Sequence, residues 1–288
     1  MKKALLIQPG KMGDLFLVTP IAKFYNNMGY QVEIPVFSNF KTFFDKISYV
    51  KAIDFGISLD EIEYHNSNRM KFWEMGKTFE QQISQEKKID GFEKSFLLFQ
   101  KINELKKSGN YDLILDPCWG FAGHELNNNT NIKIKEAYEN NKKWIKLKYD
   151  LCNVPYEQRY NFTWERDTSK EEELLNFIKN FAKKKYGNEE YSIVHNYHGS
   201  NNKILTEIKN PIKFSYIKGF EVYDWIKVLE NSKNIVCIDS CLCHFVETQN
   251  SLENIRKIYL GSEERHWHHF MFNILKNNWE NYSSSNID

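Results

Sequence analysis

Two short polar segments carry the residue types that could do chemistry, and each is preceded by or begins with an apolar run typical of a buried strand. The first, residues 8–20, reads Gln-Pro-Gly-Lys-Met-Gly-Asp-Leu-Phe-Leu-Val-Thr-Pro. The second, residues 235–244, reads Ile-Val-Cys-Ile-Asp-Ser-Cys-Leu-Cys-His. Because ligands of open parallel sheets bind beyond the carboxyl ends of the strands, each segment predicts a binding edge.

The first segment predicts an acceptor or phosphate loop followed by a carboxylate. Gly10 and Gly13 would let the amides around Lys11 and Met12 approach a ligand, with the positive end of a helix behind them. The pattern is neither a dinucleotide Gly-x-Gly-x-x-Gly nor a Walker loop, which ends in Gly-Lys-Ser/Thr. Asp14 could take a proton from a substrate, or it could simply cap the helix.

The second segment predicts a turn that could hold a diphosphate. Ser240 can cap the following helix, which would leave the amides of Cys241 and Leu242 available to an anion. Asp239 is either a ligand contact or an acceptor that shapes its own turn. His244 is either a ligand contact or a buried core histidine.

The elements around these segments alternate between strands and helices. Strands are predicted at residues 3–8, 31–37, 49–55, 111–116, 191–195, 212–217 and 234–238. Helices are predicted from Asp14, within 69–107, from a Ser169 cap and at 222–229, and residues 133–164 receive no prediction. The pattern predicts an α/β protein with parallel sheets and two domains, residues 1–165 and 166–288.

The two segments together resemble one known family. Gly-x-x-Gly-Asp-x-x-x-x-x-Pro from Gly10 and Asp-Ser-x-x-x-His from Asp239 are similar to motifs of the heptosyltransferase-like family, glycosyltransferase family 9. The resemblance implies the GT-B fold: two facing Rossmann-like domains, with the acceptor bound on the first and the sugar nucleotide on the second. It also implies an inverting displacement that needs no metal and no cofactor, since a nucleoside-diphosphate sugar is the co-substrate. The second domain is abbreviated here, so the reaction class is carried over and the sugar is not.

The resemblance also implies residue roles. Asp14 falls where the family has the base that deprotonates the acceptor hydroxyl. The turn from Asp239 to Leu242 would hold the diphosphate, with His244 on the same helix. Lys203 falls where the family has a basic residue that contacts phosphate.

Composition narrows the function only slightly. The 288 residues are 41% hydrophobic and 27% charged, as in a packed soluble protein. The 39 basic and 38 acidic residues give no global field that would favour nucleic acid or an anionic membrane. The five cysteines are odd in number and unevenly spaced, which indicates reduced thiols, and no apolar run is long enough for a signal peptide or a spanning helix. A cytoplasmic protein, able to lie against the inner membrane, is expected.

Three further groups of residues, which are basic, histidine-rich or cysteine-containing, each have more than one possible role. The runs Lys183–Lys185 and Lys142–Lys143 with Trp144 could bind nucleic acid or lipid headgroups, or be solvated faces. Residues 265–269 could close over a base or diphosphate, or form a solvated helix surface. A zinc site from Cys241, Cys243 and the histidines is disfavoured, because two cysteines two positions apart on a helix point in different directions.

The main hypothesis is a metal-independent glycosyltransferase that extends a surface glycan or glycolipid such as lipopolysaccharide. One alternative keeps the enzyme and changes the acceptor to hydroxymethylated cytosine in phage DNA. Another alternative is a non-catalytic nucleotide-binding module that retains the fold.

Overall fold

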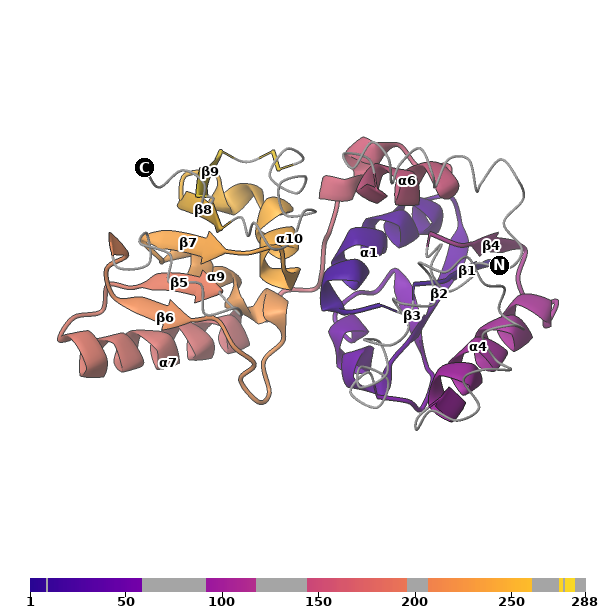
Figure 1. Cartoon of the computed structure of the whole chain (residues 1–288), viewed down its shortest axis with the longest axis horizontal. Coiled ribbons are helices and arrows are strands. Elements are labelled where there is room, and N and C mark those ends of the chain that lie inside the picture. The colour runs from indigo at the N-terminus through magenta and orange to yellow at the C-terminus, as the bar shows by residue number, and fades with distance from the viewer. Residues whose placement is uncertain are drawn as a thin grey trace. The chain divides into compact units, whose positions relative to one another are not determined.

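The computed structural model describes residues 1–8, 10–58, 92–117, 144–195, 207–260, 275–276 and 278–282, with the backbone alone for 92–99 and 144. The described residues up to Arg159 form one compact unit, and those from Tyr160 form a second (Figure 1). Each unit contains one sheet whose strand pairs are all parallel. The predicted α/β class with two parallel sheets is therefore confirmed.

The first unit is built on a sheet of four strands in the order β3-β2-β1-β4. Its described elements are β1 (Lys2–Leu6), α1 (Met12–Asn27), β2 (Tyr30–Val36), the 3-10 helix η1 (Ser38–Phe44), β3 (Val50–Asp54), α4 (Phe92–Lys107), β4 (Leu113–Leu115), α6 (Trp144–Leu151) and η2 (Tyr156–Tyr160). β1 is central, since Ala4 lies opposite Val32 of β2 and Leu113 of β4.

Burial explains why these segments fold as they do. In α1 every residue from Leu15 to Ala22 is buried, so this part of the helix is covered on all sides. Alternate residues of β1 point to opposite faces of the sheet. On the α4 face, Leu5 packs in a cluster of buried residues that also holds Ile7, Phe37, Phe55, Ile57 and Ile102. Figure 1 shows α1 and α4 flanking this sheet.

The second unit is built on a sheet of five strands in the order β6-β5-β7-β8-β9. Its described elements are α7 (Thr168–Tyr186), β5 (Ser192–His195), β6 (Pro211–Lys213), η3 (Val222–Trp225), α9 (Ile226–Glu230), β7 (Asn234–Cys237), α10 (Cys241–Glu247), η4 (Asn250–Leu252), β8 (Arg256–Leu260) and β9 (Trp279–Tyr282). Its sheet buries an aliphatic cluster of Val194, Ile208, Val236, Ile238, Ile258 and Leu260.

Both sheets have a topological switch point, where successive crossovers leave in opposite directions. In the first sheet the chain runs outward from β1 to β3 and then returns to place β4 on the other side of β1. In the second sheet β6 lies on one side of β5 and β7 on the other. Ligands of open α/β sheets bind in the crevice that forms at such a point, beyond the carboxyl ends of the strands.

The structure corrects the prediction for the cap of α7. The helix begins at Thr168, and its cap is Asp167, whose side chain accepts a hydrogen bond from the Lys170 amide at 3.1 Å. Ser169 lies inside the first turn. Asp167, Thr168 and Ser169 are three consecutive residues able to cap a helix, so their types alone do not select one.

Six described elements lie where no element was predicted. These are η1, α6 and η2 in the first half of the chain, and η4, β8 and β9 near its end. The strand predicted at 212–217 is shorter, since β6 covers Pro211–Lys213. Within the described ranges, no helix is long and apolar enough to cross a membrane.

Candidate functional site

The first candidate site lies at the switch point of the first sheet, where β1 and β4 end. Gln8 follows β1, Pro117 follows β4, and Asp14 is in the first turn of α1. The ammonium of Lys148, on α6, lies 2.7 Å from Gln8 Oε1 and 3.5 Å from the carbonyl oxygen of Pro117. The same ammonium lies 3.8 Å from Asp14 Oδ1. The fold thus brings the predicted base against a buried cation.

Gly10 provides the space that the Asp14 carboxylate occupies. A Cβ added at Gly10 would lie 2.7 Å from both the Cβ and the Oδ2 of Asp14, and 2.8 Å from Gln8 Nε2. Contacts below 3.0 Å cannot be accommodated without a shift of the neighbours. A glycine is therefore required here by the position of the carboxylate.

The rest of the predicted loop forms the start of α1. Lys11 is the N-cap residue, with an extended backbone and no side-chain cap hydrogen bond, and Met12 and Gly13 are the first two helical residues. Asp14 is therefore the third residue of the helix and does not cap it. A carboxylate in the first turn is still favoured by the helix dipole, so its place is compatible with a structural or a chemical role.

Lys148 is a site residue that the sequence did not predict. It lies on α6, which is fixed to α1 by two tyrosine hydroxyls. Tyr149 donates to the Leu17 carbonyl at 2.8 Å, and Tyr25 donates to the Cys152 carbonyl at 2.6 Å. Residues 133–164 show no clear period, so no signal in the sequence placed Lys148 near Asp14.

The second candidate site lies beyond the carboxyl end of β7. The chain continues through Asp239 and Ser240 into α10, whose first two residues are Cys241 and Leu242. Ser240 Oγ caps this helix by accepting a hydrogen bond from the Cys243 amide at 3.4 Å. The predicted cap is confirmed, and the first amides of such a helix have no acceptor within the helix.

His195 joins this turn from the neighbouring strand and was not predicted as a site residue. It ends β5, and its Nδ1 lies 2.8 Å from Ser240 Oγ. The imidazole is buried and packs edge-on to Phe214, with ring centroids 5.0 Å apart. The signal available in the sequence was a polar residue ending an apolar strand run.

Burial, together with the positive charge of Lys213, lowers the pKa of His195 from 6.5 to about 4. The folded state therefore binds this proton less readily than the unfolded chain does. The contribution of neutral His195 to the free energy of unfolding should be fully present above pH 6.5. It should decrease by up to roughly 3 kcal/mol as the pH drops toward 4. Urea unfolding midpoints measured from pH 7 to 4.5 test this prediction. A His195→Gln variant should lose less stability over that range, and an equal loss would contradict the assignment.

Asp239 and His244 contact one another. His244 Nε2 lies 3.3 Å from Asp239 Oδ1, and both side chains are largely buried. His244 Nδ1 is also buried, and it has no hydrogen-bond partner among the described residues. From the next strand, burial and the nearby Asp239 carboxylate raise the pKa of Tyr259. Asp239 therefore contacts α10 through His244, and its role toward a ligand stays a prediction.

Cys241 and Cys243, in the first turn of α10, are protonated thiols at neutral pH. Desolvation raises the pKa of Cys241 to about 12, and a hydrogen bond with Cys237 together with burial raises the pKa of Cys243. Thiolates are the reactive and metal-binding form of cysteine. Within the ranges that the structure describes, no group of three or more His, Cys, Asp or Glu residues is arranged to hold a metal ion.

Three predictions lie outside the described residues. They are Lys203, predicted to contact phosphate, the basic pair at 142–143, and the run at 265–269, predicted as a possible closing segment. The roles of the other predicted site residues stay predictions, with positions now given by the fold.

Neither a family model nor a curated protein matches this sequence. Solved structures are similar to it. A glycosyltransferase family 9 protein from Veillonella parvula DSM 2008 aligns with a TM-score of 0.49 and 8% identity, over 99% of this chain and 86% of that chain. E. coli ADP-heptose lps heptosyltransferase II gives a TM-score of 0.46 and 11% identity, over 98% and 90%. E. coli heptosyltransferase WaaC with ADP gives 0.45 and 11%, over 98% and 93%.

These comparisons return the family that the two motifs resemble. The identities are near one residue in ten and the TM-scores lie below 0.5. They therefore assign no activity and no residue role to this chain.

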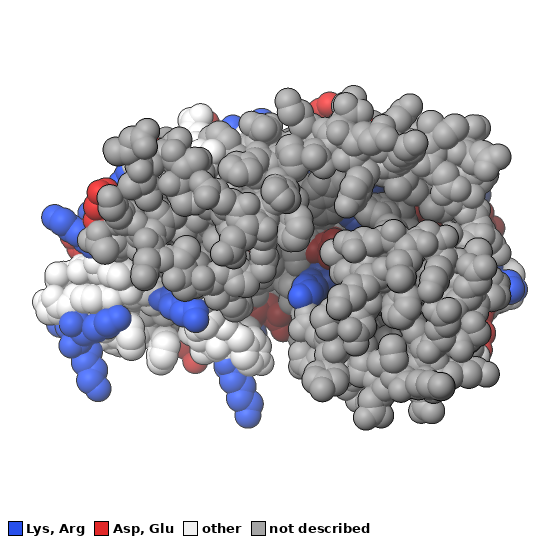
Figure 2. All heavy atoms as spheres, viewed as in Figure 1, with Lys and Arg blue, Asp and Glu red and all other residues white. Residues whose placement is uncertain are grey.

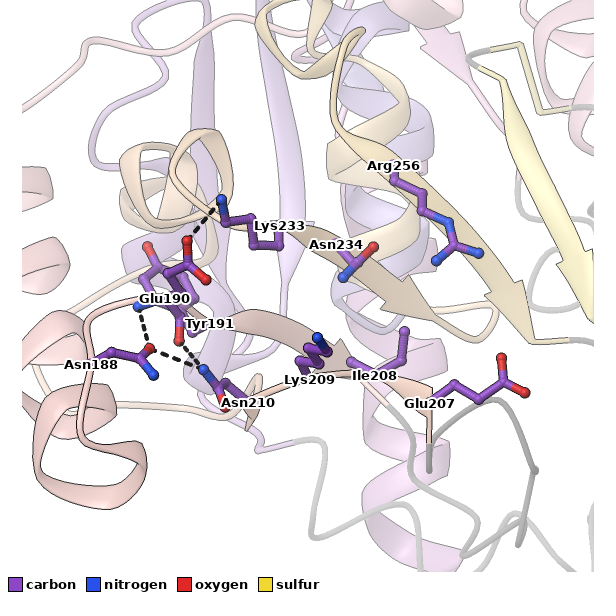
Figure 3. Close-up of a pocket in the computed structure, with 10 residues that line it drawn as sticks. All are labelled: Asn188, Glu190, Tyr191, Glu207, Ile208, Lys209, Asn210, Lys233, Asn234 and Arg256. Atoms are coloured by element: carbon purple, nitrogen blue, oxygen red, sulfur yellow. Dashed lines mark hydrogen bonds and ion pairs between the residues drawn. The ribbon is translucent and has the colours of Figure 1, made fainter.

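A polar pocket of about 530 Å³ lies at the opposite edge of the second sheet (Figure 3). Its lining residues precede or begin the strands, and they include Glu190, Lys209, Lys233 and Arg256. Lys233 pairs with Glu190 at 3.0 Å, and Arg256 pairs with Glu280 through two hydrogen bonds of 2.8 and 2.7 Å. Because it lies at the amino ends of the strands, this pocket is separate from the candidate site.

The basic run Lys183–Lys185 occupies the last turn of α7. Cations at this end of a helix stabilise its dipole, and Lys183 lies 3.8 Å from Glu189. In Figure 2 basic side chains project from the edge of the molecule where α7 lies in Figure 1. This arrangement agrees with a solvated face. The second run, residues 142–143 with Trp144, has no described side chain.

Proposed function

We propose that this protein transfers a sugar from a nucleoside-diphosphate sugar to the hydroxyl of an acceptor. The observation that carries the proposal is the Asp14 carboxylate at the switch point of the first sheet, fitted against Gly10 and facing a buried ammonium. A carboxylate held in this way at a ligand-binding edge is suited to take a proton from a bound hydroxyl. The resemblance of the surrounding motif to glycosyltransferase family 9 supports the same role.

The proposed reaction is a single displacement. Asp14 accepts the proton of the acceptor hydroxyl while the oxygen forms a bond to the anomeric carbon of the sugar. The bond between that carbon and the diphosphate breaks, and the nucleoside diphosphate leaves with the electron pair. Attack from the side opposite the leaving group inverts the anomeric configuration. Stabilisation of the charge on the departing diphosphate is the larger electrostatic task.

The turn after β7 is proposed to hold the diphosphate, with Lys203 as a further cation. Ser240 supports this turn by two contacts, one to the Cys243 amide and one to His195. The first amides of α10, from Cys241 and Leu242, provide donors. Asp239, in the turn, contacts His244, on α10.

Ser240→Ala is expected to raise the KM for the sugar nucleotide by up to about thirtyfold, because the turn loses its cap and its contact with His195, each worth about 1 kcal/mol. The change in kcat should be smaller. Steady-state kinetics with varied donor check this prediction. Ser232→Ala is the matched control, since Ser232 is a buried serine that donates to the Leu229 carbonyl at the end of α9. An equal rise in KM for both variants would contradict the assignment.

The acceptor is proposed to be a surface glycan or glycolipid. The net charge of +1 does not separate this acceptor from DNA, because lipopolysaccharide and DNA are both anionic. A direct test incubates the protein and a sugar-nucleotide panel with lipopolysaccharide core, with hydroxymethylcytosine-containing DNA, or with neither. Glycosylated lipopolysaccharide supports the proposal. Glycosylated DNA would show that the proposed reaction is correct and that its acceptor is DNA. Tight nucleotide binding without product in any mixture would favour a non-catalytic module.

A further inference from the structure

Lys148 is a buried lysine whose ammonium faces the reactive carboxylate of the proposed site. Its side chain is 4% exposed, whereas that of Asp14 is 32% exposed. A buried cation is costly unless oxygen atoms surround it and an opposite charge lies near. Gln8 Oε1 and the Pro117 carbonyl supply neutral oxygens, and Asp14 Oδ1 supplies charge.

A second buried lysine shows what a purely structural arrangement looks like in this chain. Lys257, on β8, donates to the carbonyl oxygens of Leu252, Glu253 and Ile255 at 2.7, 3.0 and 2.9 Å. Leu252 ends η4, and the other two acceptors belong to the loop between η4 and β8. Lys148 instead joins the ends of β1 and β4 to the first turn of α1, and its charged neighbour is the proposed base.

The two oxygens of Asp14 have different surroundings. Oδ1 is the oxygen nearest to the Lys148 ammonium, and Oδ2 is the one that a Cβ at Gly10 would strike. From this geometry we infer that Lys148 is a positioning residue, which holds Oδ1 and thereby directs Oδ2 to the acceptor hydroxyl. The inference rests on the proposed function.

The surroundings of Lys148 also suit the proton transfer. When Oδ2 takes the proton of the hydroxyl, Asp14 becomes neutral and Lys148 keeps its own proton. The ammonium then still has Gln8 Oε1 at 2.7 Å and the Pro117 carbonyl at 3.5 Å. The Lys148 ammonium therefore keeps these two neutral oxygen neighbours while Asp14 is protonated.

A double-mutant cycle tests the inference: wild type, Lys148→Met, Asp14→Asn and the double variant. Lys148→Met should lower kcat by about 10- to 100-fold, because a misplaced base loses much of its effect, and should change the donor KM less than about threefold. In the Asp14→Asn background the same substitution should change kcat less than about twofold. Lys257→Met is the control for loss of a buried lysine, and its effect should be the same in both backgrounds.

An equal loss of kcat in both backgrounds, or a rise in donor KM with kcat unchanged, would overturn the positioning role. Urea unfolding midpoints of the same four proteins test the contact without activity. The change in midpoint of the double variant should differ from the sum of the changes in the two single variants. A change equal to that sum would show that Lys148 and Asp14 are not coupled. If wild type transfers no sugar in the full panel, the proposed function fails, and the midpoints still decide whether Lys148 holds Asp14.

Discussion

Asp14→Asn is expected to lower kcat about a thousandfold and to leave the KM for the sugar nucleotide nearly unchanged. The amide has the shape of the carboxylate but cannot accept the proton of the hydroxyl, and general-base catalysis contributes about 10²- to 10⁴-fold. The donor is proposed to bind on the second unit, to which Asp14 does not belong. Initial rates of nucleoside-diphosphate release, with donor and acceptor varied separately, measure both quantities.

Asp45→Asn is the matched control for this substitution. Asp45 is an exposed carboxylate in the same unit, directly after η1. The control should retain wild-type kcat and unfold near the wild-type midpoint, and the Asp14 variant should stay folded, with its midpoint shifted only by the lost charge beside Lys148. Retention of more than a tenth of kcat in the Asp14 variant would rule out its role as the base.

Gly10→Ala is expected to lower kcat about a hundredfold with the chain still folded. The added Cβ would lie 2.7 Å from Asp14 Oδ2 and 2.8 Å from Gln8 Nε2, so both side chains must move. A misplacement of a catalytic group by about 1 Å can cost about 10²-fold in rate. Kinetics together with urea unfolding separate this effect from a loss of fold.

Gly29→Ala is the control for Gly10→Ala, and it should lose stability without losing activity. Gly29 follows α1 with a φ of 87°, and a Cβ there would meet no atom within 4 Å. Alanine is strained at positive φ, so the variant should lose about 1 kcal/mol of stability and keep its kcat. If Gly10→Ala showed this same pattern, the fit of Asp14 against Gly10 would have no part in catalysis.

The opening β-α-β unit was predictable because its signals are local. β1 is a short apolar run, and Leu15, Val18 and Ala22 recur at helical spacing in α1. β5 and β7 are also short apolar runs, and they are buried on both faces of their sheet. The position of Asp14 at the start of the helix after the first strand follows from the same local signals.

The environment of Asp14 was not predictable, because it depends on contacts distant in sequence. Lys148 is separated from Gln8 by 140 residues, and it lies in α6, whose helix has only eight residues and no clear apolar period. His195 meets Ser240 across 45 residues and two neighbouring strands. Spacing along the chain gives no information on such pairs until the order of the strands is known.

Sequence reasoning was also limited where several residues can do one task. Asp167 and Ser169 are both able to cap α7, and the structure selects Asp167. β8 has an apolar run, Ile258–Leu260, that is short enough to suit either a strand or part of a helix. Its assignment as a strand depends on pairing with β7 and β9.

The most direct test of the central claim is product analysis with purified protein, a panel of nucleoside-diphosphate sugars and hydroxyl acceptors. Mass spectrometry of the acceptor, together with the amount of nucleoside diphosphate released, should show one sugar added for each diphosphate released. Asp14→Asn should abolish both signals to the same extent. Equal product from wild type and Asp14→Asn would contradict the account, as would hydrolysis of the donor without glycosylation of any acceptor.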